Sequence, residues 1–353
     1  MQQRKIAIVI ENIAEKGGTE RVASSLANAL AGRFGYRVDL LSISGDRSFY
    51  PLAPEVRLRF MRGKTPGWSW RLAWFMRAGR YDSIITISMG RLSVIMVPCL
   101  RLLCPRSRLL LSEHVSFHQY PWPMKWLKLL VYLLGDRTIL LTQKDLRNIR
   151  RWVPADKCLV IENVSPFPLQ PPRHEAQPPV ALAVGRLCFQ KGFDRLIAAW
   201  QQIATRPAAG DWRLHIVGDG PDRAALQRQI DQAGLSDRIM LLPATPNIAD
   251  HYRRASLLLL TSRYEGLPMV LIEAMSFGLP LVAFDCQTGP AELIEHDGNG
   301  YLVTEGDIAA FSERTLALIE NAPLRARFAR RSLEKAQRFS PERIYSQWQQ
   351  LIA

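Results

Sequence analysis

Short apolar runs alternate with helical patterns along the first half of the chain. Runs of four to six residues predict buried strands, and segments with apolar residues three or four positions apart predict helices. The predicted strands are residues 6–10, 38–43, 83–88, 109–112 and 138–142, and the predicted helices are residues 19–30 and 125–134. This alternation is typical of βαβ units around a parallel sheet.

A proline-rich segment interrupts this pattern near the middle of the chain. The sequence VSPFPLQPPRHEAQPPV, residues 164–180, contains six prolines, which exclude a helix or a central strand. We therefore predict a linker at residues 166–179 between an N-terminal domain, residues 1–165, and a C-terminal domain, residues 180–339.

The alternation of strands and helices starts again after the linker. The predicted strands are residues 180–184, 214–217, 239–242, 257–260 and 281–284, and the predicted helices are residues 193–202, 223–232, 247–254 and 269–276. Residues 340–353 begin with Ser-Pro and carry Ile344, Trp348 and Leu351 near helical spacing, which predicts a closing helix that packs on the body. We expect an α/β fold of two Rossmann-like parallel-sheet domains that face a cleft.

Composition narrows the class of protein. The chain has 353 residues, 48% of them hydrophobic, and a net charge of +14, which favours phosphate-rich partners such as nucleic acid, anionic lipid or a nucleoside diphosphate. Its five cysteines form no C-x-x-C pair, so a disulfide scaffold or zinc site is not expected. Apolar stretches are too short, or interrupted by Arg101 and Lys128, to predict a membrane span.

Two glycine-containing segments follow predicted strands. Gly17 and Gly18 precede a helix, so they mark either a tight turn or a place where a bound group approaches the backbone. Gly218 and Gly220 have the G-x-G spacing of a dinucleotide site, but the third position holds the large Arg223. A nicotinamide dehydrogenase is therefore not expected, although these glycines can still pack against a base or a sugar.

Charged residues follow two strands of the second half. Arg186 and Lys191 lie five positions apart after the strand at residues 180–184, where they are either solvated surface cations or ligands of a diphosphate. In the segment YEGLPMVLIEAMSFG, residues 264–278, Gly266 permits close approach, Pro268 suits a first helical turn, and Gly278 ends the helix. The free amides of that helix form an anion site. Seven residues separate Glu265, in the loop before the helix, from Glu273 inside it. Either Glu265 caps the helix and Glu273 lies on the surface, or a carboxylate here accepts hydrogen bonds from a vicinal diol such as a ribose.

The combination of GGTERV, GRLCFQKG, VGDGP and YEGLPMVLIEAMSFGLPLVAFD resembles the retaining glycosyltransferases of family 4, which have the GT-B fold. The resemblance covers essentially the whole chain. It implies an enzyme that transfers a hexose from a nucleoside-diphosphate sugar, with a UDP-sugar favoured, and that requires no metal or other cofactor. In agreement, no D-x-D motif occurs in a convincing context at a strand end.

The resemblance also implies roles for individual residues. Arg186 and Lys191 would neutralise the donor diphosphate, and Glu265 would lie beside the hexose hydroxyls. The amides of Gly266 and Leu267 would lie near the phosphates, with Gly218 among the donor-binding residues, and Glu273 would hold the ribose hydroxyls. Gly17 and Gly18 would lie near the phosphates and acceptor. His114 would match the active-site histidine, with Glu113 and His118 as alternatives for that position.

Two segments of the N-terminal half bear on the acceptor. Residues 63–80 and 118–135 mix Trp, Leu and Phe with Lys or Arg, which is typical either of an amphipathic core helix or of a helix at a membrane interface. With the positive charge, we favour a peripheral enzyme at the cytoplasmic face of the inner membrane. The expected acceptor is a glycan or a polyprenyl-linked saccharide in exopolysaccharide, O-antigen or lipopolysaccharide synthesis.

Two rival functions remain. A nucleotide-sugar epimerase of the same fold would turn over the donor without an acceptor. A basic, non-enzymatic nucleic-acid-binding protein is permitted by the charge, but no recognised DNA- or RNA-binding motif accompanies that charge, so no nucleic-acid partner is expected.

Overall fold

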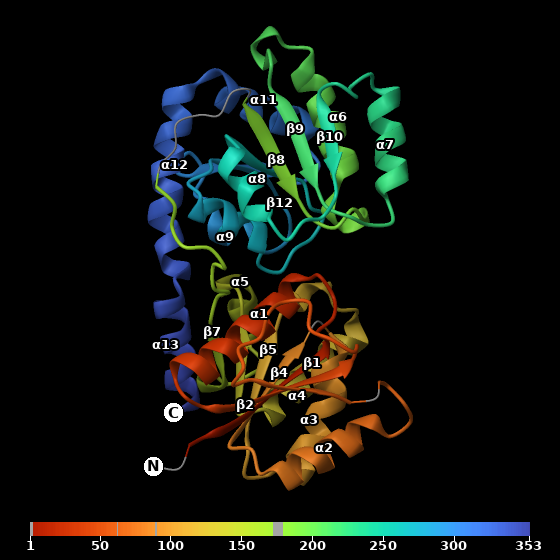
Figure 1. Cartoon of the computed structure of the whole chain (residues 1–353), viewed down its shortest axis with the longest axis vertical. Helices are drawn as coiled ribbons and strands as arrows, with labels where there is room; N and C mark the ends of the chain where they lie inside the picture. The colour runs from red at the N-terminus through yellow and green to blue at the C-terminus, as the bar shows by residue number, and fades with distance from the viewer. Residues whose placement is uncertain (1–2, 62, 89, 172–178) are drawn as a thin grey trace. The chain divides into compact units, whose positions relative to one another are not determined.

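The computed structural model describes residues 3–61, 63–88, 90–171 and 179–353. The chain divides into two α/β units (Figure 1). Unit 1 comprises Met1–Val164 and Pro341–Ala353, and unit 2 comprises Ser165–Ser340. Of the predicted linker at residues 166–179, residues 172–178 lie outside the described residues.

Unit 1 is built on a sheet of seven parallel strands in the order β3-β2-β1-β4-β5-β6-β7. Ile8 on the inner strand β1 pairs with Leu40 of β2 on one side and with Ile85 of β4 on the other. The strands are β1 (Lys5–Asn12), β2 (Arg37–Ser44), β3 (Arg57–Phe60), β4 (Ser83–Ser88), β5 (Arg108–Glu113), β6 (Arg137–Leu140) and β7 (Cys158–Val160). The helices are α1 (Gly18–Asn28), α2 (Trp68–Gly79), α3 (Arg91–Leu103), α4 (Trp122–Leu134), α5 (Gln143–Ile149) and α13 (Pro341–Ile352).

Helices cover both faces of this sheet because successive residues of each central strand are apolar and point to opposite faces. On one face, Ile6 and Ile8 pack with α1 and with Trp348 of α13. On the other face, Ala7 and Val9 belong to a core that contains side chains of α2, α3, α4 and α5.

Unit 2 is built on six parallel strands in the order β10-β9-β8-β11-β12-β13. The strands are β8 (Val180–Val184), β9 (Arg213–Val217), β10 (Ile239–Leu242), β11 (Leu257–Leu260), β12 (Leu281–Asp285) and β13 (Gly300–Thr304). The helices are α6 (Phe193–Ala204), α7 (Arg223–Gln232), α8 (Ile248–Arg254), α9 (Met269–Ser276), α10 (Pro290–Leu293), α11 (Ile308–Glu320) and α12 (Ala322–Ala336). Trp200 and Phe311 belong to the main core of this unit and are almost fully buried.

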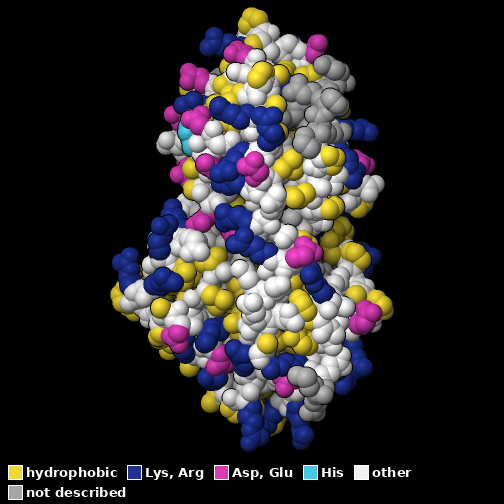
Figure 2. All heavy atoms as spheres, turned by 90° about the vertical axis from the view of Figure 1, so that its left-hand side faces the viewer, with side chains coloured by type: hydrophobic (Ala, Val, Ile, Leu, Met, Phe, Trp, Pro, Cys, Tyr) yellow, Lys and Arg dark blue, Asp and Glu magenta, His cyan; other side chains and the backbone are white. Residues whose placement is uncertain are grey.

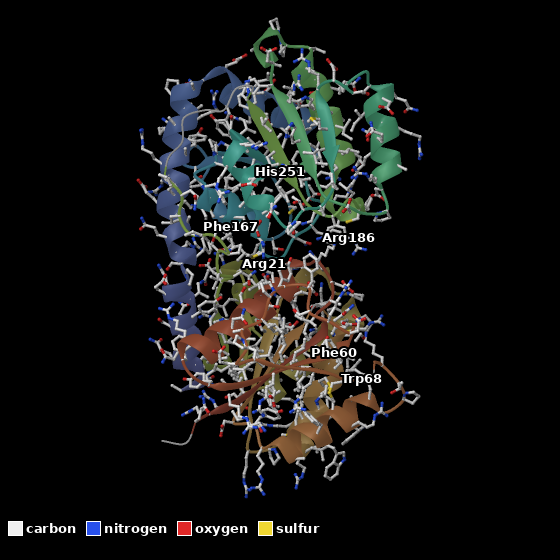
Figure 3. All side chains as sticks on the ribbon, in the orientation of Figure 1. Arg21, Phe60, Trp68, Phe167, Arg186 and His251 are labelled. Atoms are coloured by element: carbon white, nitrogen blue, oxygen red, sulfur yellow. The ribbon has the colours of Figure 1, made fainter. Side chains whose placement is uncertain are left out.

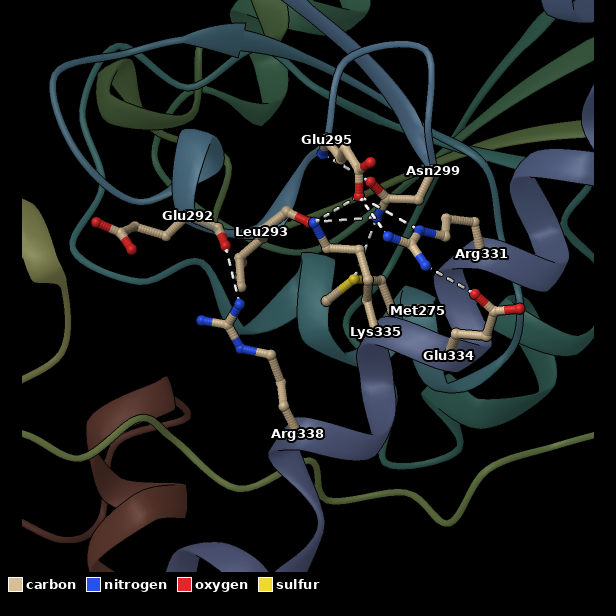
Figure 4. Close-up of polar contacts among 9 residues, drawn as sticks. All are labelled: Met275, Glu292, Leu293, Glu295, Asn299, Arg331, Glu334, Lys335 and Arg338. Atoms are coloured by element: carbon tan, nitrogen blue, oxygen red, sulfur yellow. Dashed lines mark hydrogen bonds and ion pairs between the residues drawn. The ribbon is translucent and has the colours of Figure 1, made fainter.

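A polar cluster holds α12 against the segment before β13 (Figure 4). Arg331 donates to Glu295 at 3.0 Å and to Glu334 at 2.9 Å. The buried Asn299 donates to the carbonyl of Leu293 at 3.2 Å. On the side of unit 2 that carries α12, Lys and Arg side chains lie among Asp and Glu side chains (Figure 2).

The predicted fold class, two Rossmann-like parallel-sheet domains, is confirmed. Several predicted boundaries are wrong by a few residues. The predicted helix 19–30 is α1 followed by a π-helical turn, Ala29–Arg33, and the predicted strand 138–142 ends at Leu140 because Thr142 caps α5. Pro268 is the N-cap residue of α9, one position before its first turn.

Candidate active site

The strand order of unit 2 reverses beside β8. Strand β8 pairs with β9 on one side and with β11 on the other. The chain continues from β8 to β9 and from β11 to β12, so it leaves the two central strands, β8 and β11, toward opposite edges of the sheet. The loops after β8 and β11 therefore start side by side at the carboxyl edge of the sheet and lead to opposite sides. Such a switch point leaves a crevice that binds ligands in open parallel sheets.

The loop after β8 carries the two predicted phosphate-binding cations. Arg186 is exposed (Figure 3), whereas Lys191 is half-buried at the end of a short 3₁₀ turn, Phe189–Lys191. Gly192 follows with φ of +63°, and a Cβ there would overlap the carbonyl oxygen of Thr261. Glycine is required here because it permits both the left-handed backbone and the close approach to the loop after β11.

Lys191 and Glu265 form an ion pair across the two loops. The Lys191 Nζ lies 2.7 Å from Glu265 Oε1, and the two side chains are 18% and 7% exposed. The Ser262 hydroxyl donates to the same carboxylate oxygen at 2.6 Å. These contacts fix a carboxylate and a cation together at the switch point, where both can meet a polar ligand.

A second ion pair fastens the same two loops. Arg263 donates from both terminal nitrogens to Asp194, at 2.9 Å and 2.6 Å, and its guanidinium lies 4.0 Å from the centre of the Phe189 ring. The hydrogen bond to Asp194 raises the pKa of Arg263 above its ordinary value. The Arg263 amide also donates to the carbonyl of Gln190 at 2.8 Å. This ion pair could not be predicted from the sequence, since its partners lie far apart in the chain and look like ordinary surface charges.

The loop after β12 supports the segment that holds Glu265. The Thr288 hydroxyl donates to the carbonyl of Glu265 at 2.5 Å. Gly289 has φ of +97°, and a Cβ there would overlap the carbonyl oxygen of Gly266. The Gly-Pro pair after a predicted strand was the available signal for this turn.

Helix α9 begins directly after this segment. Leu267 is buried and Pro268 makes no side-chain cap hydrogen bond with the first turn. Glu273 lies on the buried side of α9 with 5% of its surface exposed, and the Tyr252 hydroxyl donates to its Oε2 at 2.7 Å. Tyr252 was missed because nothing in the local pattern of α8 distinguishes it from a core aromatic residue.

The glycines after β9 have a structural role. A Cβ at Gly218 would overlap the carbonyl oxygen of Gly185, and one at Gly220 would overlap that of Leu187. Arg223, which breaks the dinucleotide pattern, donates to the carbonyls of Gly218 at 3.2 Å and Leu241 at 2.8 Å. Gly218 therefore lets the loop after β9 lie directly against the loop that carries Arg186.

In unit 1, the strand order reverses beside β1, and Gly17 and Gly18 follow that strand. Gly17 is the N-cap residue of α1, and Gly18 is its first residue. A Cβ at Gly17 would overlap the carboxylate of Glu20, which folds back over this turn. Burial raises the pKa of Glu20 to about 7, although the amides of Glu20 and Gly17 hydrogen-bond its carboxyl group.

His114 follows β5 and is buried, with its Nε2 atom 3.1 Å from the hydroxyl of Ser112. Burial lowers the pKa of His114 to about 4, so the ring is neutral at pH 7. Of the two alternatives, Glu113 pairs with the buried Lys128 at 2.6 Å, and His118 lies in a 3₁₀ turn, Phe117–Gln119.

The predicted site residues thus fall into two sets. Arg186, Lys191, Gly218, Glu265, Gly266, Leu267 and Glu273 belong to unit 2, and Gly17, Gly18 and His114 belong to unit 1. Within the described ranges, no group of three or more His, Cys, Asp and Glu residues is arranged to hold a metal ion. None of the described helices has the length and apolar character needed to cross a membrane.

Two family models match the chain. The model described as "Glycosyl transferases group 1" matches residues 168–335, and "Glycosyltransferase Family 4" matches residues 16–164. The matches divide near the boundary between the two units.

Comparison with individual proteins gives full-length matches. The chain is 34% identical to the amylovoran biosynthesis glycosyltransferase AmsD of Erwinia amylovora, over 99% of each chain. Its fold is similar to that of the lipopolysaccharide outer core galactosyltransferase WaaB, with a TM-score of 0.76 and 22% identity over 99% of each chain. It is also similar to Anabaena Alr3699/HepE in complex with UDP and glucose, with a TM-score of 0.79 and 19% identity over 99% of each chain.

Proposed function

The chain belongs to the GT-B glycosyltransferases of the family 4 type, and we propose that it transfers a hexose with retention of anomeric configuration from a UDP-sugar to a saccharide or lipid-linked acceptor. We place this reaction in the biosynthesis of a bacterial exopolysaccharide, O-antigen or lipopolysaccharide. The similarity to AmsD, an amylovoran biosynthesis glycosyltransferase, and to WaaB, a lipopolysaccharide outer core galactosyltransferase, supports that setting. The UDP in the HepE structure supports the choice of nucleotide.

The pair of Lys191 and Glu265 at the switch point is the observation that carries the proposal. A nucleoside-diphosphate sugar presents a phosphate group directly beside a polyhydroxylated ring. A cation and a carboxylate 2.7 Å apart can meet those two groups together, the ammonium at the phosphate and the carboxylate at the hydroxyls. The exposed Arg186 on the same loop would supply a second positive charge to the diphosphate.

Other groups of unit 2 complete the donor site in this proposal. The amides of Gly266 and Leu267, just before α9, would donate to phosphate oxygens, aided by the partial positive charge at the helix N-terminus. Glu273 would accept hydrogen bonds from the ribose hydroxyls, while its Oε2 atom accepts a hydrogen bond from the Tyr252 hydroxyl. Gly218 would maintain the close loop packing that this arrangement needs.

In the reaction, the bond from the anomeric carbon to the diphosphate oxygen breaks through an oxocarbenium-like state. The acceptor hydroxyl forms the new bond on the same face and gives its proton to the departing phosphate oxygen, so UDP leaves as a protonated anion. Arg186, Lys191 and the α9 amides would stabilise that anion electrostatically, which requires no metal. On the acceptor side we assign Gly17, Gly18 and His114, whose neutral ring can share a hydrogen bond with a sugar hydroxyl.

Thermal unfolding with UDP-, GDP- and ADP-sugars tests the donor. A ligand at about 100 times its Kd stabilises the protein by roughly 2.7 kcal/mol, so the true donor should shift the unfolding temperature most. The variant Glu273→Gln should weaken that shift for the intact donor and for free UDP alike. The variant Glu265→Gln should weaken it mainly for the intact donor. Equal shifts with all three nucleotides, or none, would contradict the assignment.

Radiolabelled donor with and without a bacterial lipid extract tests the reaction class. Sugar transfer that requires the extract supports a transferase with a lipid-linked acceptor. Turnover of the donor to an epimer without acceptor would instead indicate a nucleotide-sugar epimerase. Oligonucleotide binding that persists in Glu265→Gln, with no transfer in the wild-type protein, would indicate a nucleic-acid-binding protein.

We also propose that the enzyme works at the cytoplasmic face of the inner membrane as a peripheral protein. A lipid-linked acceptor is confined to that surface. The high positive charge of the chain supports the same location, since bilayers that contain anionic lipids attract basic proteins.

A further inference from the structure

Helices α2, α3 and α4 form the outer layer on one face of the unit 1 sheet. Helix α3 packs against both α2 and α4, so the three helices lie side by side (Figure 1). The outward surface of this layer is unusually apolar. We call this layer, together with Trp152, the aromatic face.

Helix α4 is apolar on its outward side as well as on its inner side. Trp122, Trp126, Leu130 and Leu133 follow helical spacing along one stripe, and they are 69%, 46%, 55% and 42% exposed. On the opposite side, Lys128 is fully buried. The rest of this inner side is apolar. A surface helix in water normally has one apolar stripe, which faces the core, so the outward stripe of α4 is a second one.

Buried polar contacts fix the outward orientation of the tryptophan stripe of α4. The Lys128 Nζ lies 2.6 Å from Glu113 Oε2 at the end of β5 and donates to the Ser93 hydroxyl of α3 at 2.8 Å. Rotating α4 to hide its tryptophans would take Lys128 away from a buried carboxylate, which is costly. The exposed stripe is therefore held outward by the native structure.

The neighbouring elements continue the apolar surface. On α2, Trp70 and Trp74 are 46% and 57% exposed, and on α3 Leu102 is 68% exposed. The exposed Trp152, just after α5, makes an edge contact with Trp126, with ring centres 5.6 Å apart. Isolated exposed apolar side chains are common, but a surface that gathers them from three adjacent helices indicates an interaction site.

The charges of this layer all have one sign. Apart from the buried Lys128, the three helices contain the cations Arg71, Arg77, Arg91, Arg101 and Lys125, and none of the three contains Asp or Glu. Of these cations, Arg101 pairs at 3.4 Å with Asp136, just after α4. On α2 the guanidinium of Arg77 lies 5.7 Å from the ring centre of Trp74. Tryptophan and leucine side chains beside cations, without acidic residues, suit the surface of a lipid bilayer. The cations can contact anionic headgroups, and the apolar side chains can reach the acyl chains.

We propose that the aromatic face docks unit 1 on the surface of an anionic lipid bilayer. The inference deepens the proposed function by assigning membrane contact to a defined surface, and it rests on that function only for the expectation of a lipid-linked acceptor. A second copy of the chain is a less suitable partner for the aromatic face than a bilayer. In a two-fold dimer the same patch meets itself, so its cations would face cations with no acidic partner in the three helices.

Vesicle flotation tests the proposal with the full chain and no donor. The wild-type protein should float with vesicles of phosphatidylcholine and phosphatidylglycerol, and less with pure phosphatidylcholine or at high salt. The double variant Trp122→Ser and Leu130→Ser should bind roughly 10- to 100-fold more weakly, because two apolar anchors are lost. Brominated lipids should quench the tryptophan fluorescence of the wild-type protein.

A matched control changes Leu169→Ser and Met240→Ser, two apolar residues of unit 2 that are 45% and 40% exposed. This control should bind vesicles like the wild type, and both double variants should keep the wild-type unfolding temperature and UDP-sugar binding. Equal loss in both variants, or no vesicle binding by the wild type, would overturn the proposal. So would a concentration-dependent dimer that only Trp122→Ser and Leu130→Ser abolishes. Donor binding measured without vesicles tests the proposed function separately.

Discussion

At the scale of single residues, the ion pair of Lys191 and Glu265 links binding to stability. Each group is mostly removed from water and satisfies the other at 2.7 Å. A diphosphate would give Lys191 a second anionic partner, while Glu265 retains the Ser262 hydroxyl at 2.6 Å. The pair therefore holds the site in order without a ligand and still presents one charge of each sign to the donor.

Lys191→Ala should lower the rate of sugar transfer about 100-fold or more, since it removes a cation from the leaving diphosphate. It should also reduce the free energy of unfolding by about 1–3 kcal/mol, because Glu265 keeps a buried charge without its cation. Steady-state kinetics and urea denaturation measure the two effects. Arg195→Ala, which breaks the exposed pair with Glu305, is the control and should change either quantity little. A similar loss in both variants would contradict a special role for Lys191.

Glu20 makes the stability of unit 1 depend on pH in a direction unusual for a carboxyl group. Burial raises its pKa from 4.5 to about 7 in the folded protein. Between these values the unfolded chain has lost the proton while the folded protein still holds it. Stability is therefore highest below the unfolded pKa and falls as the pH rises toward 7.

Glu20→Gln should remove that loss, because the amide has no charge to bury. The shift of the pKa sets an upper limit of about 3 kcal/mol, and partial solvent screening reduces the expected gain at pH 8 to about 1–3 kcal/mol. At pH 4 the variant and the wild type should have nearly equal stability. Urea denaturation at both pH values measures this. A variant equally stabilised, or destabilised, at pH 4 and pH 8 would be incompatible with titration of Glu20.

The sequence placed Arg186, Lys191 and Glu265 in loops that follow predicted strands, and the structure has them there. Their roles at a donor site come from the family resemblance and stay predictions. The ion pair of Lys191 with Glu265 joins residues 74 positions apart, and that of Arg263 with Asp194 joins residues 69 positions apart. Such contacts depend on which loops are neighbours at the edge of the sheet. The strand order that makes them neighbours cannot be predicted from either segment alone.

At the scale of elements, the buried pair of Lys128 and Glu113 joins α4 to β5. Burial lowers the pKa of Lys128, although the charge of Glu113 opposes this. The Lys128→Met variant should lower the free energy of unfolding by about 3–5 kcal/mol, because it leaves the buried carboxylate of Glu113 without its cation. The double variant Lys128→Met and Glu113→Gln should cost clearly less than the sum of the single changes. Chemical denaturation of all four proteins measures the coupling, and strictly additive costs would show that the two residues act independently.

Close packing between loops can be tested at Gly218. A Cβ there would overlap the carbonyl of Gly185, so Gly218→Ala should force the loops after β8 and β9 apart. We expect a loss of about 1–3 kcal/mol in stability and weaker binding of UDP-sugars, measured by thermal unfolding and calorimetry. Gly32 has no atom within 4 Å of an added Cβ and serves as the control. Gly32→Ala should be neutral or slightly stabilising. A Gly218→Ala protein with unchanged donor binding would exclude this loop contact from the donor site.

Most elements of both sheets could be predicted because buried parallel strands are short apolar runs. The strands β4, β8, β10 and β11 match their predicted ranges at both ends. Helix α3 was not predicted, since Pro98 lies inside it and interrupts the helical pattern. The strand β3 was missed for another reason. It lies at the edge of the sheet and alternates exposed and half-buried residues, so it lacks a continuous apolar run.

At the scale of the whole molecule, the described residues form three hydrophobic core clusters, two on the faces of the unit 1 sheet and one in unit 2, and the chain returns to unit 1 at its end. Helix α13 follows unit 2 in sequence but packs in unit 1, where Ile344, Trp348 and Leu351 are buried with α1 and β1. The sequence predicted this helix and its packing residues from their spacing. It could not indicate which unit receives them, because an apolar stripe does not specify its partner.

This division predicts that the two units unfold as distinguishable transitions. Trp348→Ala should destabilise unit 1 by about 3–5 kcal/mol, since it removes a large buried side chain and leaves a cavity. Differential scanning calorimetry should then show an earlier transition for unit 1, while a UDP-sugar still raises the transition of unit 2. Trp200→Ala, at a residue 1% exposed in unit 2, is the matched change and should lower the other transition. If both variants shift one common transition equally, the units unfold cooperatively and the assignment of α13 to an independent unit 1 core is wrong.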